Sequence, residues 1–147
     1  MAEETEVQEQ PKPAEPEPKP APEPPLTAMA VIAPIVGWLV PGGGHFLLKH
    51  WGRGAILFVS VAMMWLLGLL MQGKVYQANT GDILDMLGFI GDLGAGGLYF
   101  LTRAMDWGRG AIHLATADYG TKYIIAAGLL NVIAAVDAHQ IALGKKP

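Results

Sequence analysis

The sequence predicts an all-α protein, an integral membrane helical bundle of three to four transmembrane helices that follows a disordered N-terminal tail. Hydrophobic residues make up 52% of the 147 residues, which is more than a soluble domain of this size needs. Residues 54–73 contain no charged side chain, although Arg53 and Lys74 flank them. Residues 11–25 include eight prolines, a composition that cannot form a packed core.

The N-terminal tail differs in charge from the rest of the chain. Residues 1–25 hold seven of the thirteen acidic residues and only two lysines, and their prolines favour a solvated, semi-rigid polyproline spacer. The acidic start of the chain does not fit a secretory signal peptide, which opens with basic residues. We therefore divide the chain into a disordered tail, residues 1–25, and a transmembrane helical domain, residues 26–147.

Four apolar stretches are candidates for membrane spans. Residues 54–73 would form a helix of about 30 Å at about 1.5 Å per residue, which matches one hydrocarbon thickness. Residues 26–40 are short and contain Pro34, so they could form either a kinked span or a re-entrant helix, and we favour the span. Residues 83–102 and 121–143 are long enough to span but contain polar side chains. Four spans would place both termini on one side of the membrane, whereas three would separate them.

Composition and motifs argue against several classes of function. Residues 26–147 carry eight basic and six acidic residues, without the basic excess of a nucleic-acid binder. The chain has no cysteine, which excludes disulfides and thiolate metal sites. No HExxH or GxSxG motif occurs, and the histidines lack a metal-binding spacing; they are His45, His50, His113 and His139. We expect no enzyme activity, no cofactor and no metal.

Two loops are predicted to lie at the membrane surface. The first contains Pro41 and three glycines that stop a helix and permit a tight reversal, and the hexapeptide WGRGAI follows it at Trp51–Ile56 and recurs at Trp107–Ile112. The recurrence is either a relic of duplication or two copies of one interfacial turn. The candidate interfacial residues are Gly42, Gly43, Gly44, His45, Trp51, Arg53, Trp107 and Arg109. The bases and free amides of the first loop could contact anionic lipid headgroups.

Two resemblances follow from these residues. The sequence Gly43-Gly44-His45-Phe46, followed by Trp51-Gly52-Arg53-Gly54 and an apolar run, resembles the two-transmembrane-helix (TM-two) domain family over residues 31–71. It departs from that family at Leu47-Leu48-Lys49 and lacks its Asp-Arg-Phe turn. The C-terminal sequence TKYIIAAGLLNVIAAVDAHQIALGKK is similar to a family of uncharacterised small bacterial membrane proteins, over most of residues 30–146. That resemblance implies a membrane helical bundle and no particular chemistry.

Polar residues within the predicted spans are the most informative. A charged side chain at the middle of a span costs about 2.5–3.5 kcal/mol on insertion scales, so Asp92 should face protein. If residues 83–102 form a continuous helix, residues spaced by three and four positions lie on one stripe of it. These residues are Asp85, Gly88, Asp92, Ala95, Tyr99 and Arg103. A second stripe is formed by Tyr123, Ala127, Asn131, Ala134, Ala138 and Ala142. We expect the stripes to pack together, with a hydrogen bond between Asp92 and Asn131.

These polar residues support two functional hypotheses. The first is a non-enzymatic membrane protein that scaffolds or modulates a membrane partner or its lipid environment, located in the cell membrane with several passes. Its partners would be the lipid bilayer and either another membrane protein or a second copy of the chain. The alternative is a small proton or ion conductor that uses Asp85, Asp92, Asp137 and His139, because carboxylates and histidines are the usual relay groups.

Overall fold

The regular structure of the described residues is helical. A computed structural model describes residues 28–78, 81–110 and 115–146, so the predicted tail, residues 1–25, lies outside it. The helices are α1 (Ala28–Leu39), α2 (Gly43–Leu47), α3 (Trp51–Leu70), α4 (Ile83–Leu93), α5 (Gly97–Ala104) and α6 (Ala115–Ala142). The described segments contain no β-strand beyond one isolated bridge between Lys74 and Arg109.

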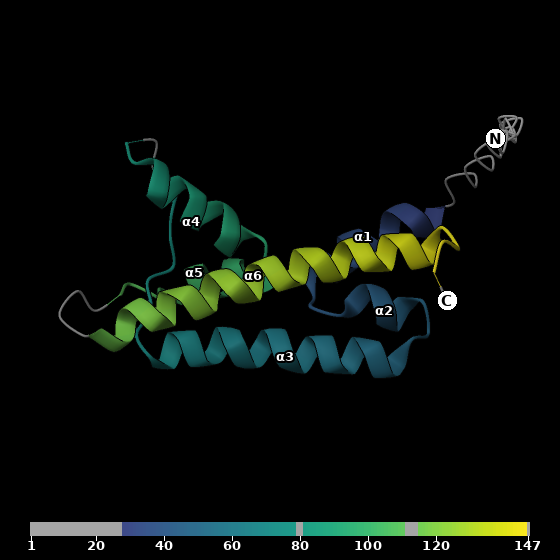
Figure 1. The fold of residues 1–147 in the computed structure, drawn as a ribbon, viewed down its shortest axis with the longest axis horizontal. Coiled ribbons are helices and arrows are strands. Elements are labelled where there is room, and N and C mark those ends of the chain that lie inside the picture. Colours follow the sequence, from purple (N-terminus) through teal and green to yellow (C-terminus); the bar gives the residue numbers. More distant parts are fainter. Residues whose placement is uncertain (1–27, 79–80, 111–114, 147) are drawn as a thin grey trace, which may run out of the picture.

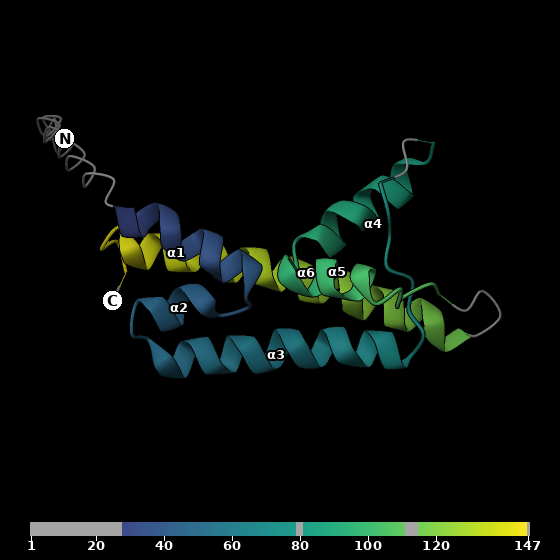
Figure 2. The ribbon, with the colours of Figure 1, turned by 180° about the vertical axis from the view of Figure 1, so that it is seen from behind.

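Two long helices, α3 and α6, lie side by side and run in opposite directions (Figures 1 and 2). They contain 20 and 28 residues and are long and apolar enough to cross a membrane. The predicted spans at residues 54–73 and 121–143 correspond to these helices, but α3 begins three residues earlier and α6 six residues earlier. The four-span prediction is not confirmed, because length and composition support two crossings, or three if α4 and α5 together form one.

The first hairpin, α1 and α2, covers only part of the length of the long helices. Helix α1 has 12 residues, about 18 Å at 1.5 Å per residue, which is shorter than the kinked span favoured at residues 26–40. It runs along the C-terminal half of α6 and stops near the middle of the bundle (Figure 1). Helix α2 then returns toward the end where α1 began (Figure 2). This geometry agrees with the re-entrant alternative for this segment.

The second hairpin, α4 and α5, replaces the continuous helix predicted at residues 83–102. The two helices are bent by 110° at the residues between them. Gly96 has a positive φ of 56°, and it lies against the backbone carbonyl of Trp38, where a Cβ atom would collide. The single predicted stripe from Asp85 to Arg103 is therefore wrong, because it assumed one unbroken helix.

The two halves of the chain repeat the same order of elements. Each half has a short helix, a turn, a shorter helix, one copy of WGRG and a long helix. Helices α2 and α5 end in the same way. Lys49 and Asp106 both have positive φ, 63° and 56°, and the next amides, of His50 and Trp107, bond back to the carbonyls of His45 and Thr102. Because α3 and α6 run in opposite directions, the second half is inverted relative to the first (Figure 1).

Small residues bring the helices together. Helix α6 contacts α1, α3 and α4 through a face that includes Gly120, Ala127, Gly128, Ala134 and Ala138, all buried. Small side chains allow backbones to approach closely in membrane helices. Large apolar side chains instead cover the outer faces, as on α3, where Ile56, Val59, Met63, Leu66 and Leu70 are each more than half exposed.

Gly68 offers a test of this packing. A Cβ atom on Gly68 would lie 2.5 Å from Cγ1 of Ile124 and 2.7 Å from the carbonyl oxygen of Gly120, so Gly68→Ala must push α3 away from α6. We expect a loss of about 1–3 kcal/mol in the free energy of unfolding in detergent. The matched control is Gly52→Ala on the same helix, where the added methyl meets nothing within 4 Å. Equal stabilities of the two variants would contradict this packing.

Candidate functional site

Asn131 joins the two hairpins at the middle of the bundle. Its side chain is completely buried, and its Nδ2 donates to the carbonyl oxygens of Trp38, at 2.9 Å, and Gly94, at 3.0 Å. These carbonyls belong to the C-terminal ends of α1 and α4, where the last four carbonyls of a helix have no partner within the helix. The indole of Trp38 adds a bond from Nε1 to the carbonyl of Leu93. Asn131 and Trp38 therefore hold both helix ends together.

Asp92 is also completely buried but bonds elsewhere. Its Oδ2 accepts a hydrogen bond of 2.6 Å from the backbone amide of Tyr76, and the carbonyl of Tyr76 accepts from the hydroxyl of Tyr99, at 3.3 Å. The expected hydrogen bond between Asp92 and Asn131 is absent, because Asp92 accepts from an amide in the connection between α3 and α4, whereas Asn131 donates to carbonyls at the ends of α1 and α4. Sequence reasoning missed Trp38 and Tyr76 as partners because they contribute backbone groups, which no pattern of side chains marks.

The other predicted polar candidates take separate partners. Asp85 pairs with the Nζ atom of Lys74 at 3.2 Å, and the Nδ1 atom of His139 donates to the carbonyl of Ala30 at 2.6 Å. Asp137 pairs with His45 and Lys146. Among the described residues, the bonds of Asp85, Asp92, Asp137 and His139 thus lead to different elements and do not link these four groups to one another.

The first glycine loop is buried within the protein. Gly42, Gly43, Gly44 and His45 are all buried, and a Cβ atom on Gly44 would lie 2.7 Å from the Cβ atom of Ala138. The loop lies inside because α2 packs against α1, α3 and α6. The amides of these glycines therefore have no exposed surface for a lipid headgroup. Lys49 and Arg53, the bases of the same expectation, are exposed, and their contact with headgroups stays a prediction.

His45 connects this loop to the C-terminal end of α6. Its side chain is 1% exposed, and its Nε2 donates to Oδ2 of Asp137 at 3.1 Å, while Lys146 donates to Oδ1 of the same carboxylate at 2.8 Å. The Nδ1 atom of His45 is buried without a partner among the described residues.

The two copies of the WGRG sequence differ in structure. Trp51 and Arg53 lie in the first turn of α3, and the ring of Trp51 lies 5.6 Å from that of Phe46. In the second copy, Gly108 and Gly110 have φ of 72° and 76°, so the chain forms an irregular loop. The guanidinium of Arg109 pairs with Asp106, and this hydrogen bond lowers the pKa of the Asp106 carboxyl below its ordinary value.

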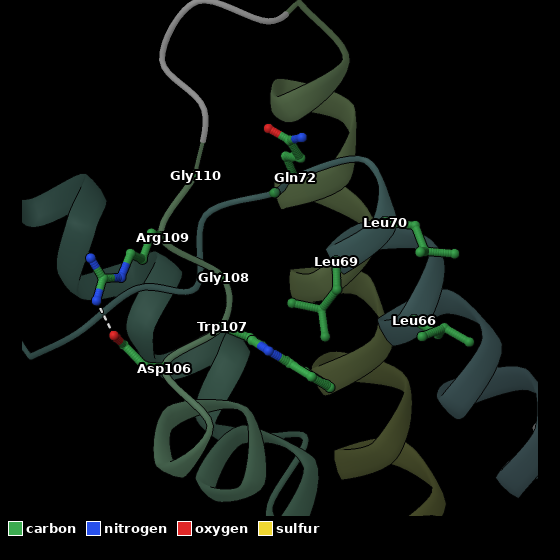
Figure 3. A pocket seen from close by; sticks show the side chains of 10 residues that line it. Leu66, Leu69, Leu70, Gln72, Asp106, Trp107, Gly108, Arg109 and Gly110 are labelled. Carbon is green, nitrogen blue, oxygen red and sulfur yellow. Dashed lines mark hydrogen bonds and ion pairs between the residues drawn. The ribbon is translucent and has the colours of Figure 1, made fainter.

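This second loop forms one wall of an apolar cleft against the end of α3. The cleft has a volume of about 470 Å³ and is lined by Leu66, Leu69, Leu70, Gln72, Gly73 and residues Asp106–Gly110. Figure 3 shows the indole of Trp107 reaching toward the side of Leu69, whereas Arg109 turns to Asp106 on the outer side of the loop. A bond from the amide of Val75 to the carbonyl of Gly108, at 2.8 Å, fixes the loop.

Comparison with known families identifies the chain. A model of the family of unknown function DUF6677 matches residues 32–147. The chain belongs to this family. This match confirms the resemblance of the C-terminal sequence to an uncharacterised family. The narrower resemblance of residues 31–71 to the TM-two domain stays a prediction. No curated protein and no solved structure matches the chain.

The junction predicts a specific loss of stability. Replacing Asn131 by Leu keeps the approximate volume but leaves the carbonyls of Trp38 and Gly94 without a donor, so we expect the free energy of unfolding to fall by about 1–3 kcal/mol. Gln140→Leu on the same helix is the control, because the side chain of Gln140 is only partly buried. Denaturant titration in detergent measures both variants, and equal losses would show that Asn131 does not tie the hairpins.

Proposed function

We propose that this protein is a non-enzymatic, multi-pass membrane protein that serves as a compact scaffold for a membrane partner or for the surrounding lipid. The observation that carries this proposal is the use of buried and partly buried polar side chains to hold other elements in place. Asn131, Trp38 and Asp92 all bond to backbone groups of other elements. Such ties stabilise a fixed shape, and the large apolar side chains that remain outside are available to lipid or to a partner.

The fold supports a particular arrangement in the membrane. In this proposal α3 and α6 cross the bilayer, while the two hairpins enter from opposite faces and meet at Asn131. Irregular backbone at that depth is tolerated where protein buries it, and the hairpin ends are buried in this way. Both termini then lie on one side, together with the turn before α3, and the segments after α3 and α5 lie on the other side.

Single-cysteine labelling tests this arrangement, since the chain has no cysteine of its own. With a membrane-impermeant maleimide, Lys49→Cys and Lys145→Cys should label from one side, and Gln77→Cys and Arg109→Cys from the other. Four crossings would instead place residues 49 and 145 on opposite sides. Three crossings, with α4 and α5 as one broken span, would separate residues 77 and 109. Either result would replace the proposed arrangement.

Conduction of protons or ions is a second candidate, favoured by one observation. Ion-coupled transporters often contain two interrupted helices in corresponding positions of inverted halves. The C-terminal ends of these helices lie near the middle of the membrane. Asp92 lies in the last turn of α4, one of the two interrupted helices of this protein, and its Oδ1 has no hydrogen-bond partner among the described residues.

A flux measurement separates the two candidates. We expect vesicles that contain the reconstituted protein to leak protons and monovalent cations no faster than protein-free vesicles. The reason is that, within the described segments, the hydrogen bonds and ion pairs of Asp85, Asp92, Asp137 and His139 do not connect these side chains into a chain. Asp92→Asn should leave the fold intact, since an amide oxygen can still accept from Tyr76. A flux in the wild-type protein that Asp92→Asn abolishes would replace the scaffold proposal with the conductor.

A further inference from the structure

We propose that the cleft between the end of α3 and the Trp107–Gly110 loop binds one anionic phospholipid of the adjacent leaflet. The proposal rests on the membrane embedding proposed above and adds to it a defined lipid site. Its parts are an apolar surface for an acyl chain, an aromatic side chain at the depth of the glycerol esters, and a basic rim for the phosphate.

The apolar part of the site continues an exposed stripe along α3. Ile56, Val59, Met63, Leu66 and Leu70 follow steps of three and four, which place them on one face of the helix, and all are exposed. Leu66 and Leu70 also line the cleft. An acyl chain that lies on this stripe therefore leads directly into the cleft, where Leu69 and Trp107 complete its walls (Figure 3).

Trp107 is suited to the membrane depth at which the acyl chains of a phospholipid join its headgroup. Its side chain is 51% exposed and lies beside the last turn of α3 (Figure 3), where that helix would leave the hydrocarbon region. Tryptophan prefers this interfacial depth, because its ring is apolar and its N–H needs a polar partner. Gln72 also lines the cleft.

The rim of the cleft has the charge to bind a phosphate. Arg109 lines both the cleft and an adjoining hollow of about 440 Å³, whose charged residues are Lys74, Arg109, Lys122 and a single acid, Asp118. A guanidinium has five N–H donors, so Arg109 can bind phosphate oxygens while it retains Asp106. Asp106 pairs with Arg109, and Asp85 pairs with Lys74. With Arg103, which lines a third hollow beside Arg109, four bases face these two acids and Asp118, and this excess of one base favours an anionic lipid over a zwitterionic one.

The left-handed glycines keep the cleft open in a defined shape. With Gly108 and Gly110 in that conformation, the loop lies against Val75 and Lys74, and the bridge between Lys74 and Arg109 holds it there. The first copy of the same sequence continues into a helix instead. The first copy therefore serves as a control for the second: Trp51 corresponds to Trp107, and Arg53 corresponds to Arg109.

Native mass spectrometry of the full chain, extracted from vesicles of mixed phosphatidylglycerol and phosphatidylcholine, tests the site. We expect the wild-type protein to retain one phosphatidylglycerol in preference to phosphatidylcholine. Arg109→Gln should reduce that retention about fivefold, the factor that corresponds to one base near an anionic lipid surface. Trp107→Ala should reduce retention of both lipids, while Arg53→Gln and Trp51→Ala should match the wild type.

A further variant acts in the opposite direction. Asp106→Asn removes the acid that competes for Arg109, and asparagine tolerates the positive φ at this position, so retention of phosphatidylglycerol should rise. Unchanged or lower retention in this variant, equal retention of the two lipids, or an equal loss in both copies of the motif would overturn the site. Displacement of the lipid by inorganic phosphate would show a free-anion site instead.

Failure of the lipid site can be told apart from failure of the membrane proposal. Extraction of vesicles with alkaline carbonate should leave the wild type and Arg109→Gln in the membrane fraction. Release of both proteins would contradict embedding itself. Full embedding without a preference for phosphatidylglycerol would contradict only the lipid site.

Discussion

The need to pair the carbonyls at the ends of two interrupted helices governs the centre of this protein. Helices α1 and α4 both stop near the middle of the bundle, where their last carbonyls lack a helical partner. Water is excluded from such a position in a bilayer, and an unpaired carbonyl there is costly. The single amide of Asn131 pairs with one carbonyl from each helix, so both hairpins depend on α6 for their position.

Close packing makes this arrangement possible. The carbonyl of Trp38 can approach Gly96, and the carbonyl of Gly91 can approach Gly128, only because neither glycine has a side chain. The hairpin ends therefore lie within reach of the short side chain of Asn131. In the proposed function, this packed centre and the apolar outer surface present a fixed shape to lipid or to a partner.

The inverted order of the two halves gives one sequence motif two roles. At Trp51 the motif begins the long helix α3, whereas at Trp107 it forms a loop beside the end of that helix. The difference arises from the surroundings, because the second copy is held by the extended segment at Lys74 and Val75. Only the second copy borders the apolar cleft, which places Arg109 and Trp107 where a lipid would meet the protein.

The sequence by itself determined the helical class, the two long apolar helices and the burial of Asp92 and Asn131, because hydrophobic length and the cost of a buried charge are local properties. The tertiary structure decided where the chain breaks and what each polar group meets. The turn after Asp92 depends on the contact of Gly96 with Trp38, and the partners of Asn131 lie 37 and 93 residues away along the chain. Such partners are backbone groups freed by the breaks, and no periodicity in the sequence specifies them.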